Sequence, residues 1–226
     1  MDANLSKLIN MRISKTIDNL KKNNINALYV PSKETALAFL KSILVNGESI
    51  AVGGSVTLDE IGALPLLRSG QYAFIDRYDK SATKEEIEER KRAGLLADTF
   101  ITGTNAITES GCLYNVDGTG NRAAAFVYGP KRVIVLAGYN KIVPDLADAV
   151  VRVKRTACPA NTIRLDSNTY CEKNGHCIKD VYDARNFMTL PAGLCKESIC
   201  CSAVISAYQR NKDRITVIII GEELGY

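Results

Sequence analysis

The sequence predicts an α/β fold in which helices cover both faces of a mainly parallel sheet. Two observations support this class. Short apolar segments alternate along the chain with segments whose apolar residues are spaced for one face of a helix. The 226 residues are also 46% hydrophobic and 24% charged, which is typical of a globular chain. We expect one domain over residues 1–226, because a chain of this length can bury roughly 70% of its unfolded surface.

The strands are expected where short apolar runs stop at proline, glycine or polar residues. The first run is stopped by Pro31, and the strongest run follows Arg132. The predicted strands are residues 27–30, 49–52, 73–76, 99–102, 132–137 and 216–220. Between residues 105 and 127 the pattern changes, since glycines interrupt short apolar pieces, as they do in hairpins and tight turns.

The helices are expected from apolar spacing and from capping residues. An N-terminal helix is predicted within residues 1–24, with its apolar face formed by Leu5, Leu8, Ile9, Ile13, Ile17 and Leu20. Ser32 is a candidate N-cap for a second helix. Further helices are predicted near residues 58–67, 84–96 and 145–156. Residues 161–214, which hold five of the seven cysteines, are predicted to be an irregular Cys-rich segment within the domain.

Charge and patterning exclude several function classes. The 29 basic and 25 acidic residues are interspersed, so no basic stripe indicates nucleic acid as a partner. The polar start predicts no signal peptide, and the apolar runs are too short for membrane insertion. We therefore expect a cytoplasmic protein with reduced thiols. The single histidine, His176, excludes most histidine-based hydrolase schemes unless it is itself the key residue.

The segment of residues 53–60 is the first candidate site, because it joins a predicted strand to a predicted helix. Gly53 and Gly54 permit backbone angles that direct successive N–H groups into one concavity, and Ser55 and Thr57 add hydroxyl donors. Such a turn, which also contains Glu60, suits a phosphate or a carboxylate. The alternative is that any strand-to-helix turn needs a glycine and a Ser or Thr cap.

Residues 102–122 are the second candidate site, because hydrogen-bonding groups gather there after a predicted core strand. In an open α/β sheet, ligands bind at the carboxyl ends of the strands. Glu109 is the candidate catalytic acid/base or nucleophile, and Arg122 is a candidate carboxylate clamp. The other candidate binding residues are Thr104, Asn105, Asn115, Asp117, Gly120 and Asn121. Turn chemistry is the alternative explanation for the Asn, Asp and Gly residues.

Lys141 is a third candidate, because it follows the strongest core strand and could face the same crevice. The alternative is an ordinary exposed lysine after a strand.

Five ordered motifs together resemble the LUD-domain family, the lactate-utilization proteins. They are Gly53-Gly54-Ser55-x-Thr57-Leu58-x-Glu60-Ile61-Gly62, Thr104-Asn105-Ala106-Ile107-Thr108-Glu109-x-Gly111, Asn115-x-Asp117-Gly118-x-Gly120-Asn121-Arg122 with Gly129-Pro130-Lys131, Gly138-x-Asn140-Lys141-Ile142-Val143, and Gly221-Glu222-Glu223-Leu224-Gly225. The resemblance implies a three-layer α/β sandwich similar to ribose-5-phosphate isomerases and CoA-transferases. It also implies a link to L-lactate oxidation, in which related proteins act beside iron–sulfur and other oxidoreductase subunits.

The C-terminal cysteines are a candidate metal site. Cytosolic cysteines in loop-rich sequence suit a tetrahedral thiolate site, and family tails similar to this one carry four closely packed cysteines, matching Cys171, Cys177, Cys195 and Cys200. An insertion at about residues 178–194 stretches the usual spacing. Structural zinc or an iron–sulfur centre, a disulfide or redox pair, and free thiols all stay open. Cys112 and Cys158 are interpreted as small core residues.

The sequence thus predicts a protein of lactate or related 2-hydroxy-acid utilization that binds a small anionic metabolite, such as lactate, pyruvate or a phosphorylated compound. No GxGxxG fingerprint is present, so hydride chemistry would need a partner or an unrecognised cofactor. One alternative is a stand-alone isomerase or acyl-transferase that uses Glu109, and another is a non-catalytic regulator that senses a metabolite. The oligomeric state stays open, a homo-oligomer included.

Overall fold

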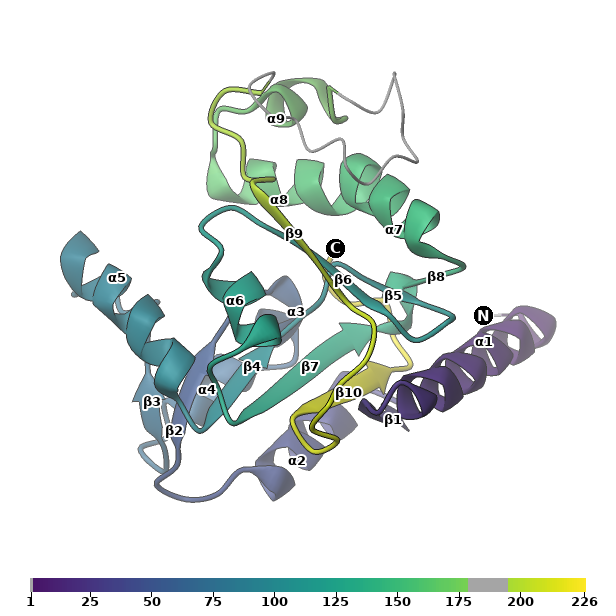
Figure 1. Ribbon diagram of the computed structural model, residues 1–226, viewed down its shortest axis with the longest axis horizontal. Coiled ribbons are helices and arrows are strands. Elements are labelled where there is room, and N and C mark those ends of the chain that lie inside the picture. Colours follow the sequence, from purple (N-terminus) through teal and green to yellow (C-terminus); the bar gives the residue numbers. More distant parts are fainter. Residues whose placement is uncertain (1, 179–194) are drawn as a thin grey trace.

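The structure is a computed structural model that describes residues 2–178 and 195–226. Its centre is a six-stranded sheet in which every neighbouring pair is parallel. The strand order is β1 (Asn26–Val30), β10 (Ile215–Ile220), β7 (Arg132–Gly138), β4 (Thr99–Thr102), β2 (Ser49–Val52) and β3 (Ala73–Ile75) (Figure 1). The predicted mainly parallel sheet, with its six strands, is confirmed.

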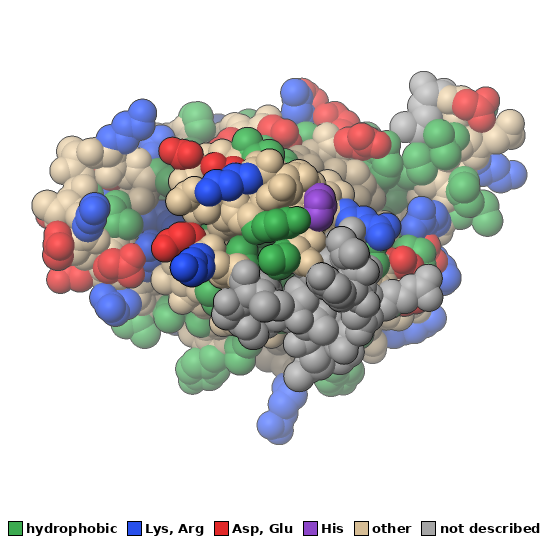
Figure 2. Space-filling view, turned by 90° about the horizontal axis from the view of Figure 1, so that it is seen from above, with side chains coloured by type: hydrophobic (Ala, Val, Ile, Leu, Met, Phe, Trp, Pro, Cys, Tyr) green, Lys and Arg blue, Asp and Glu red, His purple; other side chains and the backbone are tan. Residues whose placement is uncertain are grey.

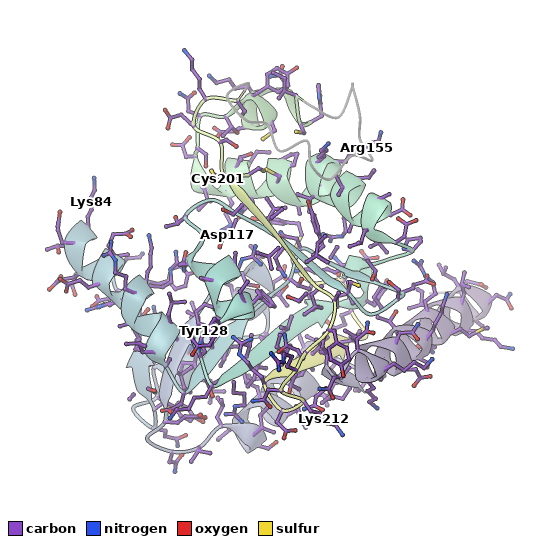
Figure 3. The ribbon with its side chains drawn as sticks, in the orientation of Figure 1. Lys84, Asp117, Tyr128, Arg155, Cys201 and Lys212 are labelled. Carbon is purple, nitrogen blue, oxygen red and sulfur yellow. The ribbon has the colours of Figure 1, made fainter. Side chains whose placement is uncertain are left out.

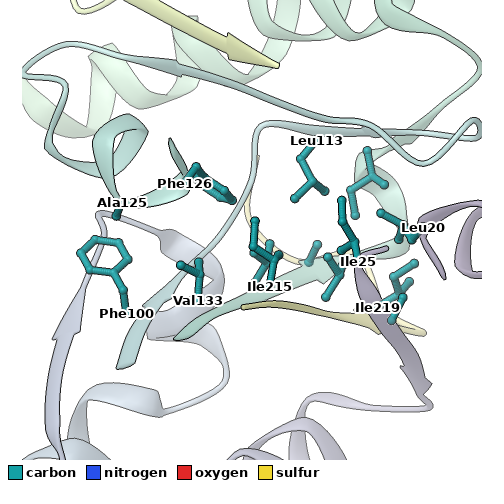
Figure 4. Packing of buried hydrophobic residues seen from close by; sticks show 14 of the residues in the cluster. Leu20, Ile25, Phe100, Leu113, Ala125, Phe126, Val133, Ile215 and Ile219 are labelled. Carbon is teal, nitrogen blue, oxygen red and sulfur yellow. The ribbon is translucent and has the colours of Figure 1, made fainter. Parts of the chain in front are cut away.

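Both faces of this sheet are covered, and its central strands β10 and β7 are almost entirely buried, which explains why they are nearly continuous apolar runs. One face packs on α2 (Lys33–Ile43), α3 (Val56–Glu60) and α4 (Ala63–Leu67), through residues such as Leu40, Leu58 and Leu67. The opposite face packs on α1 (Ala3–Lys22) and α6 (Asn121–Val127) through Leu20, Ala125 and Phe126 (Figure 4). The helix α5 (Lys84–Ala93) buries no residue and lies at the β3 side of the molecule (Figure 1).

A second, four-stranded sheet lies above the first one, in the order β8 (Ile142–Val143), β5 (Ala106–Thr108), β6 (Leu113–Asp117) and β9 (Ser202–Ser206) (Figure 1). Its inner residues, including Ile107 and Leu113, join the core shared with the central sheet. Its outer residues, including Tyr114 and Val116, pack against a helical layer. This layer consists of α7 (Leu146–Arg152), a π-helical turn (Val153–Ala157), α8 (Cys158–Leu165) and α9 (Tyr170–Asn174).

Two predicted elements differ from the structure. The helix expected near residues 58–67 is two short helices, because Gly62 between them has a φ of 76°, which ends a right-handed helix. The segment of residues 161–214 is less irregular than predicted, since it contains the end of α8, all of α9 and β9. Most of its insertion, residues 179–194, lies outside the described residues.

Within the described part of the chain, no helix combines the length and the apolar character needed to cross a membrane. The face seen from the side of α7–α9 carries basic and acidic side chains side by side, with His176 in purple (Figure 2). A continuous basic stripe is not visible on this face.

Candidate functional site

A cavity of about 240 Å³, called the main cavity below, lies at the carboxyl ends of the parallel strands. Residues directly after β2 and β4 form one wall, and Lys141 follows β7. The end of β6 and the start of α6 form a second wall, and the helical layer above supplies a third. This is the edge at which open α/β sheets bind ligands.

Two glycines let the turns after β2 and β4 pack closely at the floor of this cavity. A Cβ atom on Gly53 would lie 2.5 Å from Oγ1 of Thr102 and 3.0 Å from Cδ of Arg122. A Cβ atom on Gly103 would lie 2.5 Å from Oγ of Ser55. Neither position has room for a side chain, so these glycines are needed for close approach.

Arg122 is a buried cation in the cavity wall, with 8% of its surface exposed. Its guanidinium donates to Oδ1 of Asn115 at 2.5 Å, to Oδ1 of Asn105 at 2.9 Å and to the carbonyl of Val116 at 2.7 Å. All three acceptors are neutral. Burial lowers the pKa of Arg122, and the charge of Asp117 opposes this shift.

Lys141 is a second buried cation, with only 3% of its surface exposed. Its Nζ atom donates to Oγ1 of Thr57 at 3.0 Å. Burial lowers the pKa of Lys141 to about 7, and the neighbouring charges of Arg152 and Arg122 act in the same direction, while Glu60 opposes them. Among the described residues, neither Lys141 nor Arg122 forms an ion pair with a carboxylate.

The cavity lining is strongly cationic. Its described side chains include four cations, namely Arg77, Arg122, Lys141 and Arg164, against the one carboxylate of Asp117. That carboxylate already accepts the N–H groups of Ala123 at 2.9 Å and of Gly118 at 3.1 Å. The described side chains of the lining therefore carry more positive than negative charge, which favours a bound anion.

The structure brings most of the predicted binding residues together. Those that line the cavity are Gly54, Ser55, Thr104, Asn105, Asp117, Asn121, Arg122 and Lys141. Thr57 and Asn115 lie behind this lining and hold Lys141 and Arg122. Gly53, Glu60 and Gly120 are outside it; the Glu60 carboxylate accepts the N–H of Gly225 at 2.7 Å.

Glu109 is the exception, because it does not line the cavity. It follows β5 at the hairpin that faces α1, where its carboxylate accepts from Nε of Arg12 and Nζ of Lys15, both at 2.8 Å. These contacts hold the pKa of Glu109 below its usual range, Lys15 most strongly. Glu109, the predicted catalytic group, is thus paired with the N-terminal helix α1 and lies outside the cavity lining.

Sequence reasoning missed several lining residues, chiefly Arg77, Tyr78, Asn161, Arg164 and Tyr226. Arg77 and Tyr78 follow β3, and all parallel strands end at the same edge, so the residues after this strand could have been included. Arg164 comes from α8, and no local signal indicates that this helix lies over the cavity.

A second, small cavity of about 10 Å³ is lined by five cysteines: Cys158, Cys171, Cys177, Cys195 and Cys200. Cys158 is buried as predicted, but its Sγ atom lies 2.8 Å from Sγ of Cys200, so it belongs to this cluster. Figure 3 shows Asp117 below Cys201, and the Cys201 N–H donates to the Asp117 carbonyl at 3.0 Å, which ties this segment to β6.

The small cavity brings together the four cysteines of the predicted metal site, which are Cys171, Cys177, Cys195 and Cys200. Over residues 2–178 and 195–226, no three His, Cys, Asp or Glu side chains are arranged to hold a metal ion. In the predicted set, the Cys195 thiol donates to the carbonyl of Lys196 at 3.6 Å. The described residues therefore do not confirm the zinc or iron–sulfur centre that the sequence left open. The donor set expected from spacing also left out Cys158, which the fold places beside Cys200.

A search of curated proteins found no match. Among solved structures, a DUF162 family protein from Deinococcus radiodurans is 15% identical, with 94% of this chain and 98% of that chain covered and a TM-score of 0.49. eIF2B delta from Chaetomium thermophilum is 20% identical over 53% of this chain and 50% of that chain, with a TM-score of 0.33. The beta subunit from the same organism is 20% identical over 54% and 42%, with a TM-score of 0.35.

The family model of the LUD domain matches residues 13–220, which is most of the chain. The resemblance expected from the five motifs is confirmed, and the chain belongs to the LUD domain family.

Proposed function

We propose that this LUD-domain protein binds a small anionic metabolite of lactate or 2-hydroxy-acid utilization in the cavity of about 240 Å³. Membership of the family supports a lactate-utilization-related protein. The observation that carries the proposal is the pair of buried cations, Arg122 and Lys141, that line the cavity without a carboxylate partner among the described residues.

Burial of these two cations is costly unless a negative charge compensates them. The lining side chains include two further cations, Arg77 and Arg164, against the single carboxylate of Asp117, so a bound anion would reduce the imbalance of charge. A carboxylate or a phosphate also accepts several hydrogen bonds, which Lys141 and the Ser55 hydroxyl can donate. Asn105 and Asn121 would orient the ligand from the wall that holds Arg122.

The size of the cavity favours a small metabolite. Pockets for drug-sized ligands enclose roughly 300–1,000 Å³, so a cavity of about 240 Å³ suits a molecule of the size of lactate, pyruvate or a small phosphorylated compound. The proposal includes redox partner subunits, because oxidation of a 2-hydroxy acid releases two electrons that another group must accept.

A ligand-dependent thermal shift tests the proposal. The purified chain is heated with lactate, pyruvate, sugar phosphates or CoA esters, and the midpoint of thermal unfolding is measured. A ligand at a hundred times its Kd stabilises the folded state by about 2.7 kcal/mol, which is readily measured. Lys141→Met is expected to abolish the shift, whereas Lys41→Gln, on the exposed face of α2, leaves it intact. If no small anion shifts the midpoint, the proposal fails.

Turnover measurements separate this proposal from its alternatives. Product formation by the isolated chain, lost in Glu109→Gln, would support the stand-alone enzyme. A shift without turnover, which persists in Glu109→Gln, agrees with binding alone, either as a subunit or as a regulator. The position of Glu109 outside the lining favours the second result.

A further inference from the structure

We propose that Cys158 and Cys200 are a redox-active pair, which a small disulfide oxidant converts to an intramolecular disulfide. The bond would join the start of α8 to the segment before β9, across the wall of the main cavity. This inference does not depend on which ligand the cavity takes.

The two sulfur atoms are already close, since Sγ of Cys158 and Sγ of Cys200 are 2.8 Å apart. A disulfide bond is about 2.05 Å long, so the sulfurs need to approach by less than about 1 Å. Both residues are free thiols in the structure. The two cysteines are 42 residues apart in the sequence, and no local motif predicts that they lie side by side.

The position of the pair gives a small oxidant access to it. Cys158 and Cys200 line both the main cavity and the small cysteine cavity, so they form the wall between the two. Cys200 is partly exposed, whereas Cys158 is 8% exposed. Cys200 is therefore the thiol that meets the oxidant first.

Cys171 completes the local arrangement. Its sulfur lies 3.5 Å from Oγ1 of Thr162 and 3.3 Å from Oγ1 of Thr169, which hold it in place. The hydrogen bond with Cys171 lowers the pKa of Cys158. The hydrogen bond with Cys200 and burial together have the larger, opposite effect, so the pKa of Cys158 is raised above its ordinary value. The buried Cys158 thus stays a thiol until a mixed disulfide on Cys200 presents it with an electrophilic sulfur.

The chemistry balances with a low-molecular-weight disulfide as the oxidant. The Cys200 thiolate attacks one sulfur of the oxidant, and its S–S bond breaks to release one thiol. Cys158 then loses its proton and attacks the Cys200 sulfur, which releases the second thiol. Two protein thiols become one disulfide, and the oxidant takes up the two electrons and two protons as two thiols.

Peptide mapping tests the proposal on the full chain. Reduced protein is treated with glutathione disulfide, and the free thiols and the cross-linked peptides are determined by mass spectrometry. We expect two fewer free thiols, one linkage between Cys158 and Cys200, and reversal by dithiothreitol. The linkage is lost in Cys158→Ser and in Cys200→Ser, and it persists in Cys201→Ser, the matched control on the neighbouring exposed thiol.

Other outcomes overturn the proposal. A linkage between another pair, a lasting mixed disulfide on Cys200, or full retention of all thiols would each contradict it. Elemental analysis of the same wild-type preparation is the second measurement. Zinc or iron bound in proportion to the chain, and lost in Cys158→Ser and Cys200→Ser, would show a metal site in place of a redox pair. The peptide map of the oxidised wild-type protein identifies the linked cysteines even if a variant fails to fold.

Discussion

Nζ of Lys141 lies 3.0 Å from Oγ1 of Thr57, although 84 residues separate them in the sequence. Lys141 follows β7, and Thr57 belongs to the short helix α3 after β2. The hydroxyl gives the buried amine a hydrogen bond but no opposite charge. This relationship leaves the cation of Lys141 available to an anion in the cavity.

Thr57→Val should weaken both stability and ligand binding. Thr57 is fully buried, and its loss leaves the amine without this acceptor, which costs about 1–3 kcal/mol of unfolding free energy. Urea unfolding and the ligand-dependent thermal shift measure the two effects. Thr156→Val, at an exposed threonine, is the matched control and should change neither. A variant with wild-type stability would contradict the role of Thr57.

Ligand affinity should fall as the pH rises through about 7, the pKa to which burial lowers Lys141. Below this pH the amine is charged and attracts the anion, and above it the neutral amine must first take up a proton. The affinity then falls by up to about tenfold per pH unit. Calorimetric titration with lactate or pyruvate at pH 6, 7 and 8 suits this test, because their carboxylates stay ionised.

The pH dependence should be lost in Lys141→Met. Arg152, Arg122 and Glu60 also interact with Lys141, and arginine stays charged over this range. An unchanged slope in the variant would assign the titration to another group. Proton uptake on binding, measured from the buffer dependence of the heat, provides an independent check.

Glu109→Gln should change stability slightly and ligand binding not at all. The ion pairs of Glu109 with Arg12 and Lys15 lie near the surface, where such pairs contribute about 0–1 kcal/mol. Because the folded state holds the pKa of Glu109 below its ordinary value, its contribution is present at neutral pH and is lost as the pH falls through that lowered value. Chemical denaturation at pH 7 and pH 3, with Arg12→Gln in a double-mutant cycle, measures the contribution of these ion pairs to the free energy of unfolding.

Gly53→Ala should destabilise the protein more than Gly54→Ala does. The new Cβ atom at position 53 would lie 2.5 Å from Oγ1 of Thr102, whereas at position 54 its nearest neighbour is Oη of Tyr78, at 3.4 Å. Overpacking of this kind costs about 1–3 kcal/mol. Equal midpoints of chemical unfolding for the two variants would show that the turn after β2 adjusts without strain.

The central sheet was predictable because each of its strands contains a short apolar run, a property that neighbouring residues in the sequence reveal. The second sheet was predictable only in part. Its antiparallel β5–β6 pair lies where glycines in the sequence indicated hairpins, but β6 pairs with β9 across about 90 residues, and β9 is mostly exposed and lacks a strong apolar pattern. The motifs after β2, β4 and β7 supply several residues that line the cavity, because parallel strands end at one edge. The roles of Glu109 and Cys158 depended on distant partners.

The sequence by itself determined the family, the positions of the main strands along the chain and several of the residues that line the cavity, because these follow from local motifs and spacing. Only the tertiary structure decided that Arg12 and Lys15 hold Glu109 away from the cavity, that Lys141 lacks a carboxylate partner among the described residues, and that Cys158 lies beside Cys200. Such pairings arise when packed layers bring distant segments together, and local patterns do not encode those distances.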